Sequence, residues 1–412
     1  MGQDLSEAID RLRRFHHHGY SVLDTLTVNA NAAIPERRYR GDDLAEVVGL
    51  PNVQRIYAEE RSGALPSPRD DNGRRLGSTL SEVMGLQAHF GTRPWRHPDD
   101  PPAIVAFANQ KGGCWKTTTS WWFGSYCAQR GLRVLLVDAD PQASLTLNCG
   151  HLPDINVHDE DTLGPLLVQG DESGAADLIR PTYLPNMQII PSCLGLASVE
   201  MSMTTELYGA DTNREAMDVL LRLQRLLASA SADYDVLVVD GTPSLGVLTT
   251  NLLLAANLIV TPVPTEITDY ASTVAFNELV ADQLASVQRL AETLDIDVRS
   301  PEIFFLPTRY SQEGTQSLGS QEVLALIQET FGDRALSTPI KKHDAAVSNL
   351  TLFRRTAFDV NATNPACGNT ARNHAVANFR AVFEEIFERG IAPLWPHGTD
   401  FMRATDTRGS KA

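Results

Sequence analysis

The sequence predicts an α/β protein built on a doubly wound, mostly parallel sheet, with a smaller all-α domain before it. Beyond residue 103, short continuous apolar runs alternate with segments of helical spacing, which is typical of strands buried on both faces. The pattern of the preceding residues instead predicts helices joined by turns that contain glycine and proline. The expected strands are 104–107, 134–137, 236–239, 258–263 and 303–306, and a long amphipathic helix is expected at 213–230.

Length and composition narrow the class of protein. The 412 residues suggest two or three domains, and 42 % apolar with 21 % charged residues is enough to bury a core. The longest apolar stretch, 252–263, is far shorter than the roughly 20 residues of a membrane span. Five scattered cysteines, without metal-ligand spacing, indicate reduced thiols and a cytoplasmic location.

The charge balance limits how the chain can meet nucleic acid. A net charge of −16 excludes indiscriminate coating of DNA, so any DNA contact requires a local basic patch. Among 35 basic residues only five are lysines, and two of these, Lys111 and Lys116, lie within six residues of each other. This concentration suggests a chemical reason for lysine at that place.

The first ninety residues contain two candidate units. Apolar residues at helical spacing predict an amphipathic helix at 5–15, whose apolar face needs a partner such as a second copy of the chain. Segments 42–48 and 52–60, separated by the turn 49–51, have the pattern of a helix-turn-helix. Turn signals on both sides of Arg69 predict a hairpin wing, and 79–90 predicts a further helix.

Basic and amide side chains of this second unit are the candidates for contacts with DNA. They are Arg40, Asn52, Gln54, Arg55, Arg69, Arg74 and Arg75. A small helical domain with solvated arginines is the alternative interpretation. The expected divisions are a dimerisation helix region at 1–35, a winged helix-turn-helix domain at 36–91, a linker at 92–102, the α/β domain at 103–395 and a polar tail at 396–412.

The loop after the first apolar run has the chemistry of a phosphate site. It follows a predicted strand and precedes a predicted helix, whose N-terminus carries a positive potential. The glycines of the loop allow backbone N–H groups to approach phosphate oxygens closely. Lys116 can reach the β- and γ-phosphates, and the Thr117 hydroxyl can ligate Mg²⁺. The candidate nucleotide-binding residues are Lys111, Gly112, Gly113, Cys114, Trp115, Lys116, Thr117 and Thr118.

The general pattern GxxxxGK[ST] is not met, because Gln110 and Trp115 occupy its outer glycine positions. The loop instead resembles the deviant Walker A motif KGGxxK[ST] of the ParA/MinD ATPases. Segments 137–144 and 234–240 resemble the second motif and the Walker B strand of that family, and 361–365 resembles a late loop. The N-terminal helix and helix-turn-helix resemble the long plasmid-partition ParA proteins, which repress their own operon.

This resemblance implies roles for particular residues. Lys111 would be the signature lysine that reaches the partner's phosphates in a nucleotide-sandwich dimer, and it would be catalytic together with Lys116 and Asp140. Asp140 would position or activate the attacking water. Thr117, Asp138 and Asp240 would support the metal ion. Asn364 and Pro365 would make further contacts with the nucleotide. Arg372 would bind DNA without sequence specificity.

The implied function is a DNA-partition ATPase that uses ATP/ADP and Mg²⁺. It would close as a homodimer on ATP, bind double-stranded DNA nonspecifically and be released when a ParB-type centromere-binding protein stimulates hydrolysis. The helix-turn-helix would bind an operator and repress transcription. The resemblance implies a bacterial, cytoplasmic and nucleoid-associated protein.

Three alternatives remain open on the sequence. Trp115, at a position that usually holds glycine, favours a nucleotide-sensing repressor with little turnover, whereas Lys116 and Asp140 disfavour it. A MinD-like membrane cycle needs a basic amphipathic helix, but 382–391 is acidic, so no membrane partner is expected. A nitrogenase-iron-protein-like reductase needs a bridging cluster, for which no cysteine pair is suitably placed.

Overall fold

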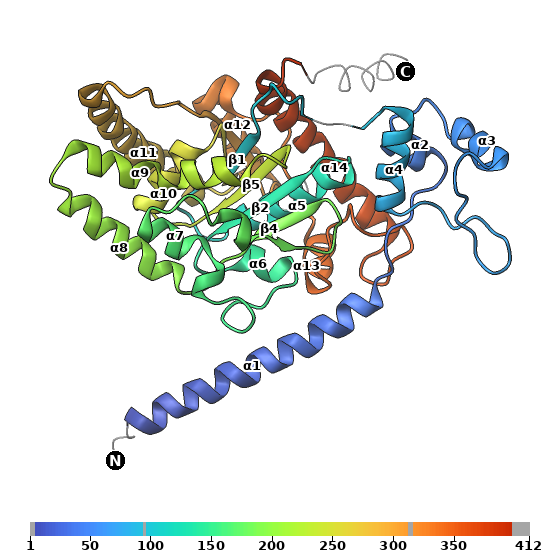
Figure 1. Cartoon of the computed structure of the whole chain (residues 1–412), viewed down its shortest axis with the longest axis horizontal. Coiled ribbons are helices and arrows are strands. Elements are labelled where there is room, and N and C mark those ends of the chain that lie inside the picture. Colours follow the sequence, from blue (N-terminus) through green and yellow to red (C-terminus); the bar gives the residue numbers. More distant parts are fainter. Residues whose placement is uncertain (1–4, 94–95, 312–315, 398–412) are drawn as a thin grey trace.

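The computed structural model describes residues 5–93, 96–311 and 316–397, and it places a long helix and a small helical unit beside a larger α/β domain (Figure 1). Within these residues, no helix is both long and apolar enough to cross a membrane. The described strands form one seven-stranded sheet in the order β3-β4-β2-β5-β1-β6-β7, and all pairs are parallel except β3 with β4. The predicted doubly wound α/β class is therefore confirmed.

All five predicted strands are present, with slightly longer bounds. They are β1 (Ala103–Phe107), β2 (Val134–Ala139), β5 (Val236–Gly241), β6 (Leu258–Pro264) and β7 (Glu302–Thr308). The short strands β3 (Arg180–Pro181) and β4 (Met187–Ile190) at one edge were not predicted.

Both faces of the sheet are covered, which explains the continuous apolar runs in its strands. Alternate residues of β1 enter different cores: Val105 joins the buried cluster that contains α5, and Ala106 joins the cluster on the other face. The first cluster includes side chains of α5 (Lys116–Gln129), α6 (Ser144–Asn148), α13 (Asp344–Leu352) and α14 (Asn369–Ile386). The second includes α7 (Leu163–Gln169), α8 (Leu196–Gly209), α9 (Asn213–Ala230), α10 (Val247–Ala255) and α11 (Ile267–Leu294), while α12 (Gln316–Phe331) packs with β7 at the far edge.

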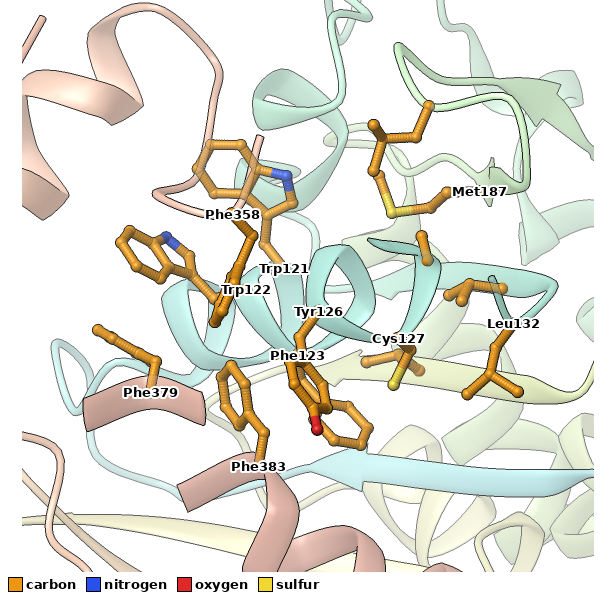
Figure 2. Close-up of a cluster of buried hydrophobic side chains, with 14 of the residues drawn as sticks. Trp121, Trp122, Phe123, Tyr126, Cys127, Leu132, Met187, Phe358, Phe379 and Phe383 are labelled. Atoms are coloured by element: carbon orange, nitrogen blue, oxygen red, sulfur yellow. The ribbon is translucent and has the colours of Figure 1, made fainter. Parts of the chain in front are cut away.

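Aromatic side chains pack along the length of helix α5 (Figure 2). Trp122 lies against Phe379 of α14, with ring centroids 4.3 Å apart, and Phe123 lies against Phe383 at 5.3 Å. Trp121 is also fully buried, and its indole N–H donates to the Tyr183 hydroxyl at 3.1 Å. Because α5 begins at the predicted phosphate loop, this packing gives that loop a rigid support.

Residues 36–91, which we call the N-terminal helical unit, contain α2 (Gly41–Val48), α3 (Gln54–Ser62) and α4 (Leu80–Phe90). These helices agree with the three predicted segments to within two residues. Left-handed glycines end α2 at Gly49 and α3 at Gly63, and a capping box at Thr79 starts α4. A bridge between Arg69 and Arg75 closes the predicted hairpin turn.

Helix α1 (Leu5–Ala33) is much longer than the predicted 5–15, and it projects away from the α/β domain (Figure 1). Residues 5–25 of this helix include exposed apolar side chains: Leu5, Ile9, Leu12, Phe15, Val22 and Leu23. In the expected linker, Arg96 donates its backbone N–H to Asp235, and the Pro101 carbonyl accepts from Trp395. The linker is thus attached to the α/β domain. Most of the expected tail, from residue 398 on, lies outside the described residues.

Candidate functional site

The predicted phosphate loop (residues 110–118) joins the end of β1 to the start of α5. Gly113 and Trp115 both have φ 73°, in the left-handed region, and α5 begins at Lys116 directly afterwards. The Asn109 side chain holds the base of the loop: its carbonyl oxygen accepts from the Lys111 N–H at 3.1 Å, and its amide donates to Pro262 O at 2.8 Å. The loop therefore has the strand–turn–helix setting that phosphate binding needs.

Lys116 lies inside this loop, and its side chain is almost completely buried. The Nζ donates to the Lys111 carbonyl at 2.9 Å and approaches Cys114 Sγ at 3.8 Å, so the side chain folds back across the loop from the first turn of α5. Cys114 Sγ also donates to the Lys111 carbonyl, at 3.1 Å. A cation held at the centre of a glycine-bearing loop is positioned to neutralise phosphate oxygens.

Lys111, the predicted signature lysine, has an ion-pair partner. Its Nζ lies 3.0 Å from Oδ1 of Asp269, which is on the first turn of α11 and is 7 % exposed, whereas the Lys111 side chain is 41 % exposed. Asp269 could not be predicted from the sequence, because a partner 158 positions away leaves no signal in local spacing. The pair keeps the exposed lysine directed along the edge of the loop.

Two predicted metal residues, Asp138 and Asp240, are directly opposite each other on the adjacent strands β2 and β5. The oxygens of Asp138 accept from the Thr146 N–H and hydroxyl, at 2.8 and 2.7 Å, and from the Asp140 N–H at 3.2 Å. Burial raises the pKa of Asp138 to about 7, against the lowering effect of these donors. Asp138 is therefore occupied in holding the start of α6, rather than free to reach a metal.

Asp240 is fully buried, but neither of its carboxylate oxygens accepts a hydrogen bond of normal geometry from the described residues. Burial raises its pKa well above the ordinary value, the charge of Asp138 adds to this, and the nearby Thr117 hydroxyl and Lys116 oppose it. Buried charged groups without partners are costly, so this carboxylate points to a cation at the end of β5.

Asp140 follows β2 in a tight turn. Its carboxylate accepts from the Gln142 N–H at 2.9 Å, and the turn continues through Ala143 with φ 53° into α6. Burial raises the pKa of Asp140, whereas the Gln142 N–H and the charge of Lys116 lower it. The structure thus brings Lys116, Asp140 and Asp240 to one end of the sheet.

The indole of Trp115 packs against the buried cluster that contains Trp121 and Trp122 of α5. It is partly buried against the core and lines a cavity of about 480 Å³ together with Thr118, residues of α6 and α13, and Leu23 of α1. The predicted conflict at this position takes the form of a left-handed backbone, which costs a residue with a Cβ about 1–2 kcal/mol.

Asn364 and Pro365, the remaining nucleotide candidates, lie in the loop before α14. The Asn364 side-chain oxygen accepts from the N–H groups of Ala366 and Cys367 at 3.0 and 2.9 Å, and its amide donates to Asn361 O. Asn364 therefore shapes its own loop, and Pro365 is exposed beside it.

The candidate DNA-binding residues fall into two groups. Arg40, Asn52, Gln54, Arg55, Arg69 and Arg74 are exposed on the N-terminal helical unit. Two others, Arg75 and Arg372, are half-buried. Arg75 forms a bidentate ion pair with Glu60, with a closest contact of 2.7 Å. Arg372 lies near Arg37 and Tyr39, where burial lowers its pKa to about 10. Neither arrangement favours a phosphate contact.

Comparison with known proteins agrees with this geometry. A family model described as an AAA domain matches residues 102–296. SopA of Escherichia coli K12 is 34 % identical over 366 residues, which cover 87 % of this chain and 90 % of SopA. A solved "Partition Protein" covers 93 % of this chain and 99 % of its own, with TM-score 0.61 and 18 % identity. A solved complex of a Cyanothece McdA variant with ATP covers 69 % and 96 %, with TM-score 0.54 and 21 % identity.

The similarity to SopA extends over most of both chains. The two solved structures share the fold. The chain belongs to the ParA/MinD-type P-loop ATPases, among the plasmid-partition proteins related to SopA.

Proposed function

We propose that this partition protein binds and hydrolyses ATP at the phosphate loop, and that hydrolysis drives a cycle of DNA binding and release. The observation that carries the proposal is the meeting of a buried lysine, Lys116, with the carboxylates of Asp140 and Asp240 at one end of the sheet. Positive charge in a loop of backbone donors, beside acidic residues, suits phosphoryl transfer. Support also comes from the ATP complex of McdA, which has the same fold.

The residues present fit a magnesium ion. Mg²⁺ prefers oxygen ligands and is usually held by one or two protein groups together with phosphate oxygens and water. Thr117 and Asp240 supply a hydroxyl and a buried carboxylate without normal hydrogen bonds. When bound, the ion would neutralise charge between the β- and γ-phosphates. Asp138 is better assigned to holding the first turn of α6 through Thr146.

In this proposal, different residues of the chain have different roles in ATP hydrolysis. The loop N–H groups and Lys116 orient the phosphates and balance the charge that develops on the leaving oxygen. The Asp140 carboxylate, at the start of the turn to α6, orients the attacking water. Lys111 exchanges Asp269 for a phosphate of a second subunit, which makes closure of a homodimer depend on ATP.

The N-terminal residues provide the contacts with DNA in this proposal. The exposed side chains on α3 and on the hairpin turn, which include Gln54, Arg55, Arg69 and Arg74, bind an operator, and operator binding represses the chain's own operon. The ATP-bound dimer binds other duplex DNA nonspecifically. A centromere-binding protein of the ParB type stimulates hydrolysis and releases the dimer, and the cycle takes place on the nucleoid.

Steady-state ATP hydrolysis, measured with and without random-sequence duplex DNA, tests this function. We expect slow turnover that rises with DNA and is lost in Lys116→Ala and Asp140→Ala. Glu206→Gln serves as the control, because Glu206 is exposed on α8, which packs on the face of the sheet opposite α5. Turnover that survives in both site variants would contradict the proposed site.

A second function is favoured by Trp115 alone. Its left-handed backbone leaves the phosphate loop strained, and such strain is compatible with a repressor that senses nucleotide but rarely hydrolyses it. The same assay distinguishes the two functions. If the wild type binds ADP but does not turn over ATP with or without DNA, the repressor becomes the better proposal.

A further inference from the structure

The N-terminal helical unit is joined to the α/β domain at the far end of α5, the helix that begins at the phosphate loop. The buried side-chain amide of Gln87, on α4, donates to the Arg130 carbonyl at 3.1 Å and to the Val47 carbonyl at 2.8 Å. Arg130 caps the C-terminus of α5. Next to it, Gly131 has φ +95°, and a Cβ there would meet the Gln87 amide at 2.3 Å. The junction therefore requires both residues.

A second connection runs through Asp359, in the loop between α13 and α14. This carboxylate is 5 % exposed and accepts from two side chains of α5, Ser125 at 2.6 Å and Gln129 at 2.9 Å. It also accepts from the Tyr183 hydroxyl at 2.9 Å and from the Thr356 N–H and hydroxyl at 2.7 and 2.8 Å. A buried carboxylate with this many donors holds its partners firmly, because separating them would leave a charge unpaired.

The loop that carries Asp359 in turn holds the N-terminal helical unit. Arg37 donates to the Phe358 carbonyl at 2.5 Å and pairs with Asp43 of α2 at 2.8 Å. The Arg38 N–H donates to the Asn361 side chain at 3.0 Å. Both connections therefore start on the last turns of α5 and end on the unit that carries the candidate operator contacts.

We propose that Asp359 and Gln87 transmit nucleotide binding at the phosphate loop to the N-terminal helical unit, with α5 as the lever. The proposal rests on the nucleotide site proposed above and adds the route by which that site controls the DNA-binding surface. In this arrangement, Asp359 and Gln87 are positioning residues. They touch neither nucleotide nor DNA.

The physical basis is the stiffness of α5. The helix spans about 21 Å at 1.5 Å per residue, and its aromatic side chains are packed tightly along this length. A change at Lys116 when phosphate enters the loop therefore shifts or rotates α5 as one body. Ser125, Gln129 and the Arg130 carbonyl move with it, and the hydrogen bonds of Asp359 and Gln87 pass the motion to α2 and α4. Tightly packed elements respond by shifts of this kind rather than by gradual deformation.

Hydrogen–deuterium exchange of the full-length chain, with and without saturating ADP and Mg²⁺, tests the proposal. In the wild type we expect ADP to change the exchange rates of peptides within 41–91, although that unit does not contain the nucleotide site. Asp359→Asn and Gln87→Met each break one of the two connections, so each should reduce this change by roughly half. The ADP affinity, measured by titration calorimetry, should stay close to the wild-type value.

Two features keep the outcomes distinct. Gln87→Met removes the donor on the N-terminal side and leaves the Asp359 network intact, so it remains informative if Asp359→Asn fails to fold. Glu206→Gln, remote from α5, should behave as the wild type. Variants that bind ADP and keep the full exchange response would overturn the coupling, and so would a wild type that binds ADP without any response in 41–91. Absence of ADP binding by the wild type would instead overturn the proposed nucleotide site.

Discussion

At the scale of single residues, Trp115 is the position where sequence and structure conflict most. Trp115→Gly removes a backbone cost of about 1–2 kcal/mol, because glycine adopts φ 73° without steric conflict. It also removes an indole that packs against the core. We expect tighter ADP binding and faster turnover, since the loop can then relax around phosphate, together with a small change in the free energy of unfolding from these opposed effects.

Calorimetric ADP affinity and steady-state turnover check this prediction, and Trp115→Ala separates the two causes. Alanine removes the indole but keeps the Cβ, so only the glycine variant relieves the backbone. If both variants changed affinity and turnover equally, the indole rather than the backbone angle would be responsible. Unchanged affinity and turnover in both variants would show that Trp115 does not strain the site.

Gly131 gives a prediction about stability. Gly131→Ala places a Cβ 2.3 Å from the Gln87 side chain at a left-handed φ, so we expect the free energy of unfolding to fall by at least about 1–2 kcal/mol. Urea denaturation measures this change. Gly209→Ala is the matched control, because Gly209 has an ordinary φ and no neighbour within 4 Å of the added methyl group. Equal losses in the two variants would mean that the contact with Gln87 is not responsible.

At the scale of elements, the parts predicted correctly are those with strong local signals. Strands such as β1 and β5 are continuous apolar runs, and α2 to α4 end at glycines or begin at a capping threonine. The four-residue strand β4 contains Gln188 and has no alternating pattern, so only its pairing with β2 reveals it. Helix α1 was predicted too short, because His16–His18 and Gly19 interrupt the apolar spacing while its backbone hydrogen bonds continue.

The candidate site shows the same division. Lys116, Asp140 and Asp240 lie in motifs next to buried strands, so their meeting follows from the parallel sheet. Asp269, which pairs with Lys111, belongs to a distant helix and depends on tertiary packing alone. The ion pair between Arg75 and Glu60 could likewise not be predicted from the sequence. Arginines in a turn give the same local pattern whether they are solvated or paired with a distant carboxylate.

Helix α1 leads to a prediction about association. Its apolar residues Leu5, Ile9 and Leu12 are between 40 and 74 % exposed, and an unpartnered amphipathic helix gains most by pairing with a second copy. Leu12→Glu should therefore weaken self-association by roughly tenfold or more, since it places a charge at a buried helix contact. Sedimentation velocity at several protein concentrations measures this. Ser21→Glu, on the opposite face, adds the same charge and should have little effect, whereas equal behaviour of the two variants would exclude α1 as the dimer contact.

At the scale of the whole molecule, the net charge of −16 sets the conditions for any DNA contact. The chain repels a polyanion at long range, so binding depends on a few exposed arginines, including Arg55, Arg69 and Arg74, acting at short range. A dimer doubles the number of such contacts on one duplex, and simultaneous engagement raises the apparent affinity without any new interaction. The ATP-dependent dimer should therefore bind random DNA far better than the monomer.

The salt dependence of that binding is the last prediction. Each phosphate contact releases condensed counterions, so the logarithm of the affinity should fall linearly with the logarithm of salt concentration, with a slope of about −0.9 per contact. With ATP and Mg²⁺ we expect a slope of roughly −4 or steeper for random duplex DNA, and a shallower slope for Leu12→Glu, whose association through α1 is weakened. Fluorescence anisotropy of a labelled duplex at several salt concentrations measures both slopes. Equal slopes for wild type and Leu12→Glu would mean that association through α1 has no part in holding the protein on DNA.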